Sequence, residues 1–96
     1  MHNIFEAENP NLFIKALLTL QTEDECRAFL EDIMTSKESL DISQRMAVAL
    51  RLDEGVSTAK IAEMTGASPT TISRVNRCYQ YGAGGYGVVI ERMKEG

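Results

Sequence analysis

Two helix starts separated by a single glycine lie within residues 57–75, which read STAKIAEMTGASPTTISRV. Ser57 and Ser68 can each cap a helix with a side-chain oxygen, and Pro69 suits the first helical position, where its missing N–H leaves no hydrogen bond unmade. Gly66 can supply the left-handed conformation that reverses the chain within a few residues. Apolar residues recur at helical spacing on the inner side of both segments: Ile61, Ala62, Met64, Ile72, Val75 and Tyr79. The stretch therefore predicts a helix-turn-helix.

The outer side of the second helix differs from an ordinary solvated surface, because it combines short hydroxyl side chains with arginine and contains no acid. Its residues are Thr70, Thr71, Ser73, Arg74 and Arg77. Short polar side chains allow a helix to lie deep in a major groove, and arginine can donate paired hydrogen bonds to guanine or phosphate. A purely structural helical hairpin is the alternative. We predict that residues 57–79 bind duplex DNA.

Charge is unevenly distributed along the 96 residues, whose net charge is −4. Residues 1–56 contain eleven acidic and five basic side chains, whereas residues 57–96 contain five basic and three acidic ones, so the two balances are −6 and +2. Within the predicted helix-turn-helix, Lys60 adds to the two arginines and Glu63 is the only acid. An acidic body with a mildly basic end favours a phosphate-bearing partner at that end.

The remaining sequence favours helices, and we expect an all-α fold. Aromatic residues are few (three Phe, three Tyr, no Trp), and only two prolines and seven glycines interrupt the chain. We expect one helix over 9–21, and a second that starts with a capping box in which Glu25 bonds back to the N–H of Thr22. TSKES is expected to be a break, with a short helical turn as the alternative, and a third helix is expected over 41–55. The glycine-rich joint GAGGYG, at 82–87, then precedes a last helix that reads VVIERMKEG.

Residues 46–50, MAVAL, make the third helix apolar on nearly all sides, which is typical of a helix buried on several sides. A chain of 96 residues has little depth in which to bury such a helix, so we expect a homodimer. We expect one domain over 1–96. Its parts are a helical dimerisation region at 1–56, the helix-turn-helix at 57–79, and the joint with the last helix at 80–96.

No other feature of the sequence indicates catalysis, a metal site or a membrane. No apolar run approaches the ~20 residues of a membrane span, and the first residues lack a secretory signal, so we expect a cytoplasmic protein. Cys26 and Cys78 form no CxxC pair and suit a reduced compartment rather than a disulfide or zinc site. His2 has no catalytic partner, and GAGGYG spells GxGxxG without the preceding strand that dinucleotide binding requires. We therefore expect neither an enzyme nor a bound metal or cofactor.

The stretch STAKIAEMTGASPTTISR, after a helix ending in ALRLDEG, resembles the DNA-binding region of the tryptophan repressor superfamily, especially its YerC/YecD-type branch. The resemblance covers most of the chain in layout and is specific over residues 41–77. It implies an all-helical homodimer with interlocked N-terminal helices. It also implies that Pro69, Thr70 and Ser73 face the bases. The implied contacts to the DNA backbone come from Lys60, Ser68 and Thr71.

The resemblance also raises the question of L-tryptophan as a co-repressor. In the tryptophan repressor, an arginine of the second helix stacks on the ligand and a glycine follows it. Arg74 matches that arginine, but Val75 stands at the glycine, where its branched side chain would occupy the space of the indole ring. The second stacking arginine corresponds to Gln44, and the neighbouring Arg45 projects about 100° further round the helix. We therefore expect no tight binding of L-tryptophan.

These features predict a homodimeric, sequence-specific transcription regulator, in its simplest form a repressor, that binds the major groove. Lys60, Arg74 and Arg77 are the expected charge contacts. One alternative is a protein-interaction module in which the helix-turn-helix is vestigial and the acidic N-terminal half docks a partner. RNA binding is a weaker alternative, because no stacking aromatics accompany the basic residues.

Overall fold

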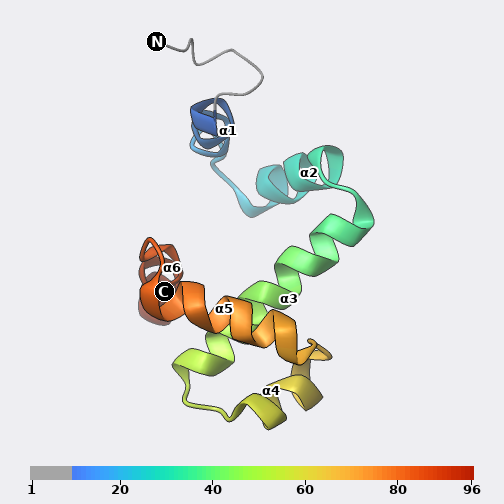
Figure 1. Ribbon diagram of the computed structural model, residues 1–96. Coiled ribbons are helices and arrows are strands. Elements are labelled where there is room, and N and C mark those ends of the chain that lie inside the picture. The colour runs from blue at the N-terminus through green and yellow to red at the C-terminus, as the bar shows by residue number, and fades with distance from the viewer. Residues whose placement is uncertain (1–9) are drawn as a thin grey trace. The chain divides into compact units, whose positions relative to one another are not determined.

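The computed structural model of the protein describes residues 10–96, and within this range the fold is all-helical, as predicted (Figure 1). The helices are α1 (Pro10–Leu17), α2 (Glu23–Ile33), α3 (Ser36–Asp53), α4 (Thr58–Thr65), α5 (Pro69–Tyr81) and α6 (Gly85–Glu95). The chain divides into two units, and the division falls after Ser39, within α3; of the first unit the structure describes residues 10–39, and the second is residues 40–96. Between residues 10 and 96, no helix is both long enough and apolar enough to cross a bilayer.

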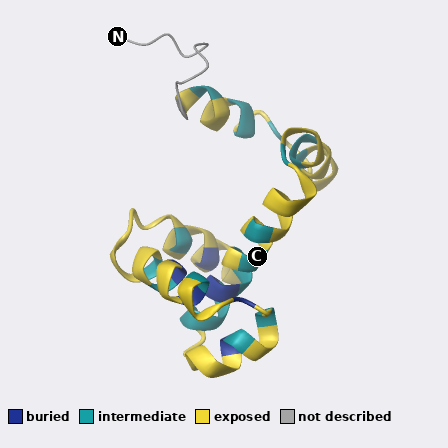
Figure 2. Cartoon of the chain, turned by 45° about the vertical axis from the view of Figure 1, so that its right-hand side comes forward, coloured by how far each residue is buried: buried dark blue, intermediate teal, exposed yellow. Residues whose placement is uncertain are grey.

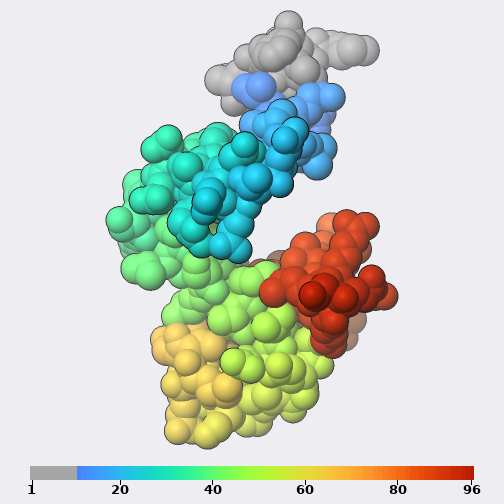
Figure 3. Space-filling model, turned by 180° about the vertical axis from the view of Figure 1, so that it is seen from behind, coloured from blue at the N-terminus to red at the C-terminus, as the bar shows by residue number. Residues whose placement is uncertain are grey.

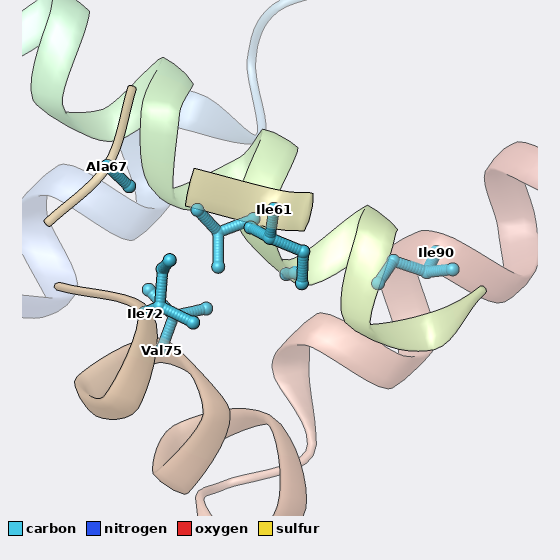
Figure 4. Close-up of a cluster of buried hydrophobic side chains, with 7 residues drawn as sticks. Ile61, Ala67, Ile72, Val75 and Ile90 are labelled. Atoms are coloured by element: carbon cyan, nitrogen blue, oxygen red, sulfur yellow. The ribbon is translucent and has the colours of Figure 1, made fainter. Parts of the chain in front are cut away.

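One hydrophobic core holds the unit of residues 40–96 together. Its buried residues are Val48, Ala49, Ile61, Ala67, Ile72, Val75 and Ile90 (Figure 4). Ile72 and Val75 are only 3% and 2% exposed, which confirms that they form the inner face of α5. Met64 is 47% exposed, so its predicted place on the inner side of α4 is wrong. The eight-residue α4 buries Ile61 alone, because a helix this short meets the core along a single turn.

Helix α3 starts at Ser36, five residues earlier than the sequence predicts. The hydroxyl of Thr35 accepts a hydrogen bond from the N–H of Glu38 at 3.1 Å, and the carboxylate of Glu38 accepts one from the N–H of Thr35 at 2.9 Å. This reciprocal capping box satisfies two amides that otherwise lack helical partners. The segment TSKES is therefore the start of α3 and not a break in the chain.

Helix α1 is shorter than the predicted helix over 9–21. After Leu18 the backbone hydrogen bonds span three residues instead of four, which makes a tighter turn. Both the N–H and the hydroxyl of Thr19 donate to the carbonyl of Ala16 there. Helix α2 is capped as predicted by Thr22, whose hydroxyl accepts from the N–H of Glu25 at 3.1 Å. The carboxylate of Glu25, however, accepts from the N–H of Gln21 at 2.8 Å, and not from that of Thr22. Both amides precede the first bond of the helix, so either can take the carboxylate.

The last helix, α6, is anchored on the unit of residues 40–96. It lies against the C-terminal part of α3 (Figure 3), where Ile90 enters the core. Its first residue is Gly85, so the glycine-rich segment is a shorter joint than expected and its last three residues are already helical. Gly84 caps the helix in the left-handed conformation, with a φ of 88°.

Candidate nucleic-acid interface

The turn between α4 and α5 has the geometry that the sequence predicts. Ser57 caps α4 by accepting from the N–H of Lys60 at 3.3 Å, and Ser68 caps α5 by accepting from the N–H of Thr71 at 3.1 Å. Gly66 has a φ of 73°, in the left-handed region, and a Cβ added there would meet nothing within 4 Å. Backbone conformation, and not lack of space, therefore requires glycine at this turn.

The polar side of α5 is open to solvent. We define the outer face of α5 as Pro69, Thr70, Ser73, Arg74 and Arg77, all of which are exposed (Figure 2). Neither arginine forms an ion pair with any residue in the described range 10–96. No carboxylate within residues 10–96 therefore lies in ion-pair contact with either guanidinium group, and their N–H donors are available for a partner in solution.

The other predicted backbone contacts lie beside this face. Lys60 and Ser68 are exposed, whereas Thr71 is half-buried. The hydroxyls of Ser68 and Thr71 are hydrogen-bonded to each other at 3.1 Å, so both hydroxyls take part in the cap of α5. Ser68 donates its only hydroxyl hydrogen to Thr71, so in this arrangement the hydroxyl of Thr71 is the one that can still donate to a phosphate oxygen.

The outer face of α5 is hollowed between its arginines and its N-terminal turn. All five of its residues, Pro69, Thr70, Ser73, Arg74 and Arg77, line a surface hollow of about 620 Å³, which we call the arginine hollow. Two guanidinium groups and two hydroxyls converge there without an acid. This lining suits a group that accepts several hydrogen bonds, such as a phosphate anion or the neutral O6/N7 edge of guanine.

A second hollow, of about 400 Å³, lies between α4 and α5. We call it the α4–α5 hollow, and its lining is Thr58, Ala59, Ala62, Pro69, Ile72, Ser73 and Asn76. It shares Pro69 and Ser73 with the arginine hollow, so the two hollows adjoin along one edge of α5. Sequence reasoning missed Thr58, Ala59 and Asn76 as surface residues of this region. Helical spacing could have found Asn76, which follows Ser73 on the same edge of α5, but the approach of α4 required coordinates.

A polar cluster fixes the C-terminal end of α5 against α3 and α6. The hydroxyl of Tyr79 donates to Oδ1 of Asp53 at 2.6 Å, and the ammonium of Lys94 donates to Oδ2. These bonds, that from Lys94 first, lower the pKa of Asp53 below its ordinary value of 3.8. The bonds to Asp53 in turn raise the pKa of Tyr79 and of Lys94 above their ordinary values. The cluster orients the helix that carries the outer face.

Nothing in the described part of the chain assembles a metal centre. Within residues 10–96, no three His, Cys, Asp or Glu side chains lie together so that they could hold a metal ion. Cys26 is half-buried, Cys78 is exposed, and both are free thiols. His2 lies outside the described residues.

The sequence matches the family described as Trp repressor protein over residues 8–94. The chain belongs to the Trp repressor family. It is 42% identical over 80 residues to the uncharacterised protein YerC of Bacillus subtilis, an alignment that covers 83% of this chain and 77% of YerC. This family is one of DNA-binding regulators rather than enzymes.

Two solved structures share this fold. A TrpR-like protein from Eubacterium eligens superposes with a TM-score of 0.86 and 43% identity, covering 97% of this chain and 96% of its own. A candidate Trp repressor from Staphylococcus aureus superposes with a TM-score of 0.84 and 38% identity, covering 88% of this chain and 84% of its own. At these identities the likeness extends beyond the fold to the family.

A third hollow, of about 340 Å³, lies beside Arg74, the residue that matches a ligand-stacking arginine of the tryptophan repressor. It is lined by Arg45, Arg74, Val75, Cys78 and Tyr86, and we call it the Tyr86 hollow. Arg45, and not the aligned Gln44, shares this hollow with Arg74, because the side-chain amide of Gln44 donates to the carbonyl of Thr65 at 3.2 Å. Val75 belongs to the hydrophobic core, as predicted, and forms part of the wall.

Proposed function

We propose that this member of the Trp repressor family is a sequence-specific transcription regulator, in its simplest form a repressor, which inserts α5 into the major groove. The observation that carries the proposal is the division of α5 into two sides. Ile72 and Val75 are buried in the core, while Arg74 and Arg77 are exposed and have no ion-pair partner within residues 10–96. A cytoplasmic location and the absence of catalytic activity are parts of the same proposal.

The regulator is proposed to act as a homodimer. Within residues 11–39, no residue is buried, although this segment contains many large apolar side chains. Phe13, Ile14 and Leu18 are 42%, 51% and 79% exposed. Ordering a segment costs conformational entropy, and only burial of apolar surface can offset this cost. Because the segment has no buried core of its own, we propose that a second copy of the chain covers its apolar side chains. Helix-turn-helix dimers, Trp repressor among them, bind half-sites about 34 Å apart, one turn of DNA.

Two measurements test this proposal. Duplex DNA is first selected from a randomised pool, and binding of the selected DNA is then measured over a range of salt concentrations. We expect one enriched palindrome and an affinity that falls by orders of magnitude between low and moderate salt, because bound phosphates release counterions. Arg77→Ala should lower the log–log salt slope by about two per dimer, since each subunit loses one contact. Arg51→Ala, which removes an arginine paired with Glu54 on α3, is the matched control and should leave the slope unchanged.

Three outcomes would contradict the proposal. They are a flat salt profile, the absence of any enriched sequence together with a stable protein partner in pull-down, and loss of the helical circular dichroism signal in Arg77→Ala. The second outcome would favour the protein-interaction alternative. The third would show that Arg77 supports the fold instead of contacting DNA.

We further propose that L-tryptophan is not a co-repressor of this protein. Val75 is 2% exposed, and its side chain belongs both to the core and to the wall of the Tyr86 hollow. An indole ring placed against Arg74 would have to displace this side chain, which costs core packing. Isothermal calorimetry with L-tryptophan should give no binding heat at micromolar concentrations. A micromolar dissociation constant would contradict the proposal.

A further inference from the structure

We propose that the α4–α5 hollow recognises thymine, by receiving its C5-methyl group beside a hydrogen bond to its O4 atom. This inference rests on the proposed binding of duplex DNA. Four of the residues that line the hollow are apolar: Ala59, Ala62, Pro69 and Ile72. None of its lining residues is charged, in contrast with the adjoining arginine hollow. The α4–α5 hollow therefore suits an apolar group, whereas the adjoining arginine hollow suits a hydrogen-bond acceptor.

The hollow exists because the residues that α4 contributes are small. The side chains of Ala59 and Ala62 end at Cβ, and a longer side chain at either position would extend into the hollow. Ile72, which is 3% exposed, belongs to the core and forms the floor. Pro69 and Ser73 form the wall that separates this hollow from the arginine hollow.

The shared wall determines which ligand can reach the hollow. A duplex bound by Arg74 and Arg77 in the arginine hollow would place the neighbouring base edges over Pro69 and Ser73. Among the four bases, only thymine presents a methyl group in the major groove. Burial of that methyl against an apolar wall removes both surfaces from water, which favours thymine over the other bases at this position.

The hollow also carries a polar side chain, Asn76, that can bond to O4, the atom beside the methyl group of thymine. Asn76 lies at the rim, and its Oδ1 accepts a hydrogen bond from Nε2 of Gln80 at 2.8 Å. This bond leaves the amide N–H₂ of Asn76 as the group that can donate toward the hollow. Thymine presents an acceptor, O4, next to its methyl, whereas cytosine presents an N–H₂ donor there. A donor on the protein therefore rejects cytosine and accepts thymine.

Base-analogue scanning of the selected DNA sequence tests this assignment. Replacing each thymine in turn by deoxyuridine removes the methyl and keeps O4. At one thymine per half-site we expect about a fourfold loss of affinity, and about fifteenfold when both half-sites are changed, the loss expected for one buried methyl each. Replacing the same pair by 5-methylcytosine and guanine keeps the methyl but presents a donor, and should also weaken binding.

A variant that fills the hollow separates this inference from the proposed function. Ala59→Leu is at an exposed position, so the fold should persist, while the sensitivity to the thymine methyl at that position should disappear. Ala28→Leu, also at an exposed position but on α2, is the matched control and should keep the sensitivity. If no sequence is enriched, both proposals fail. If DNA binds with the Arg77-dependent salt slope but no thymine is methyl-sensitive, or if the sensitivity persists in Ala59→Leu, the thymine assignment alone is overturned.

Discussion

At the scale of single residues, Asp53 connects two distant parts of the chain to the end of α3 through its carboxylate. It accepts hydrogen bonds from Tyr79, 26 positions later, and from Lys94, 41 positions later. Periodicity predicted that Tyr79 lies on the inner side of α5, and it is half-buried there. Periodicity could not predict its bond to Asp53, because that bond depends on where the end of α3 crosses α5 and α6. The orientation of Ile72, Val75 and the arginines, in contrast, follows from the helical repeat alone.

The Asp53 contacts predict a pH dependence of stability. The pKa of Asp53 is lowered in the folded protein, chiefly by Lys94, so its contribution is present above the ordinary carboxyl pKa near 3.8. The contribution is lost as the pH falls through the lowered folded value. Asp53→Asn should therefore lower the melting temperature at neutral pH and flatten its decline in acid. Thermal melts from pH 7 down to pH 2 would show this, with the exposed Asp32→Asn as control. An unchanged acid limb in Asp53→Asn would contradict it.

At the scale of elements, the starts of α2, α4 and α5 could be predicted from their capping residues, whereas those of α3 and α6 could not. Thr22, Ser57 and Ser68 cap the helices for which the sequence predicted them. The start of α3 was missed, although Thr35 and Glu38 have the spacing of a capping box. Serine, threonine and charged residues are also common in loops, so the pattern becomes decisive only when the backbone around it is helical.

Two glycines that differ in backbone conformation provide a prediction at the same scale. A Cβ added to Gly66 or to Gly87 would meet nothing within 4 Å, so neither substitution creates a clash. Gly66 has a φ of 73°, and Gly66→Ala should lower the free energy of unfolding by about 1–2 kcal/mol. Gly87 lies inside α6, and Gly87→Ala should raise it by about 0.5–1 kcal/mol. Urea denaturation of both variants measures these changes, and equal effects of the same sign would contradict the argument.

At the scale of the whole molecule, the structure does not support the reason for which dimerisation was expected from the apolar run of α3. The apolar run at 46–50 was expected to need a second chain for its burial, yet Val48 and Ala49 are completely buried within one chain. Helices α4, α5 and α6 supply the other residues of that core. Exposed large apolar side chains lie elsewhere: on α1, on α2 and on the first turns of α3, where Leu40 is 70% exposed, and also on α6, where Val88, Val89 and Met93 are 48%, 47% and 55% exposed. The apolar run and the short chain indicated that some apolar surface needs a cover, but not which part of the chain leaves it open.

If a second copy covers this surface, folding and association are linked. The melting temperature should then rise with protein concentration, because dissociation accompanies unfolding. Leu18 is 79% exposed within one chain, and Leu18→Glu should shift the sedimentation profile toward monomer and remove the concentration dependence. Ala28→Glu adds the same charge at an exposed position of α2 that lies about 100–160° round the helix from Phe29, Leu30 and Ile33, and it should leave the dimer intact. A melting temperature independent of concentration in the unmodified chain, with sedimentation as a monomer, would show that α1 and α2 are stabilised by something other than a second copy.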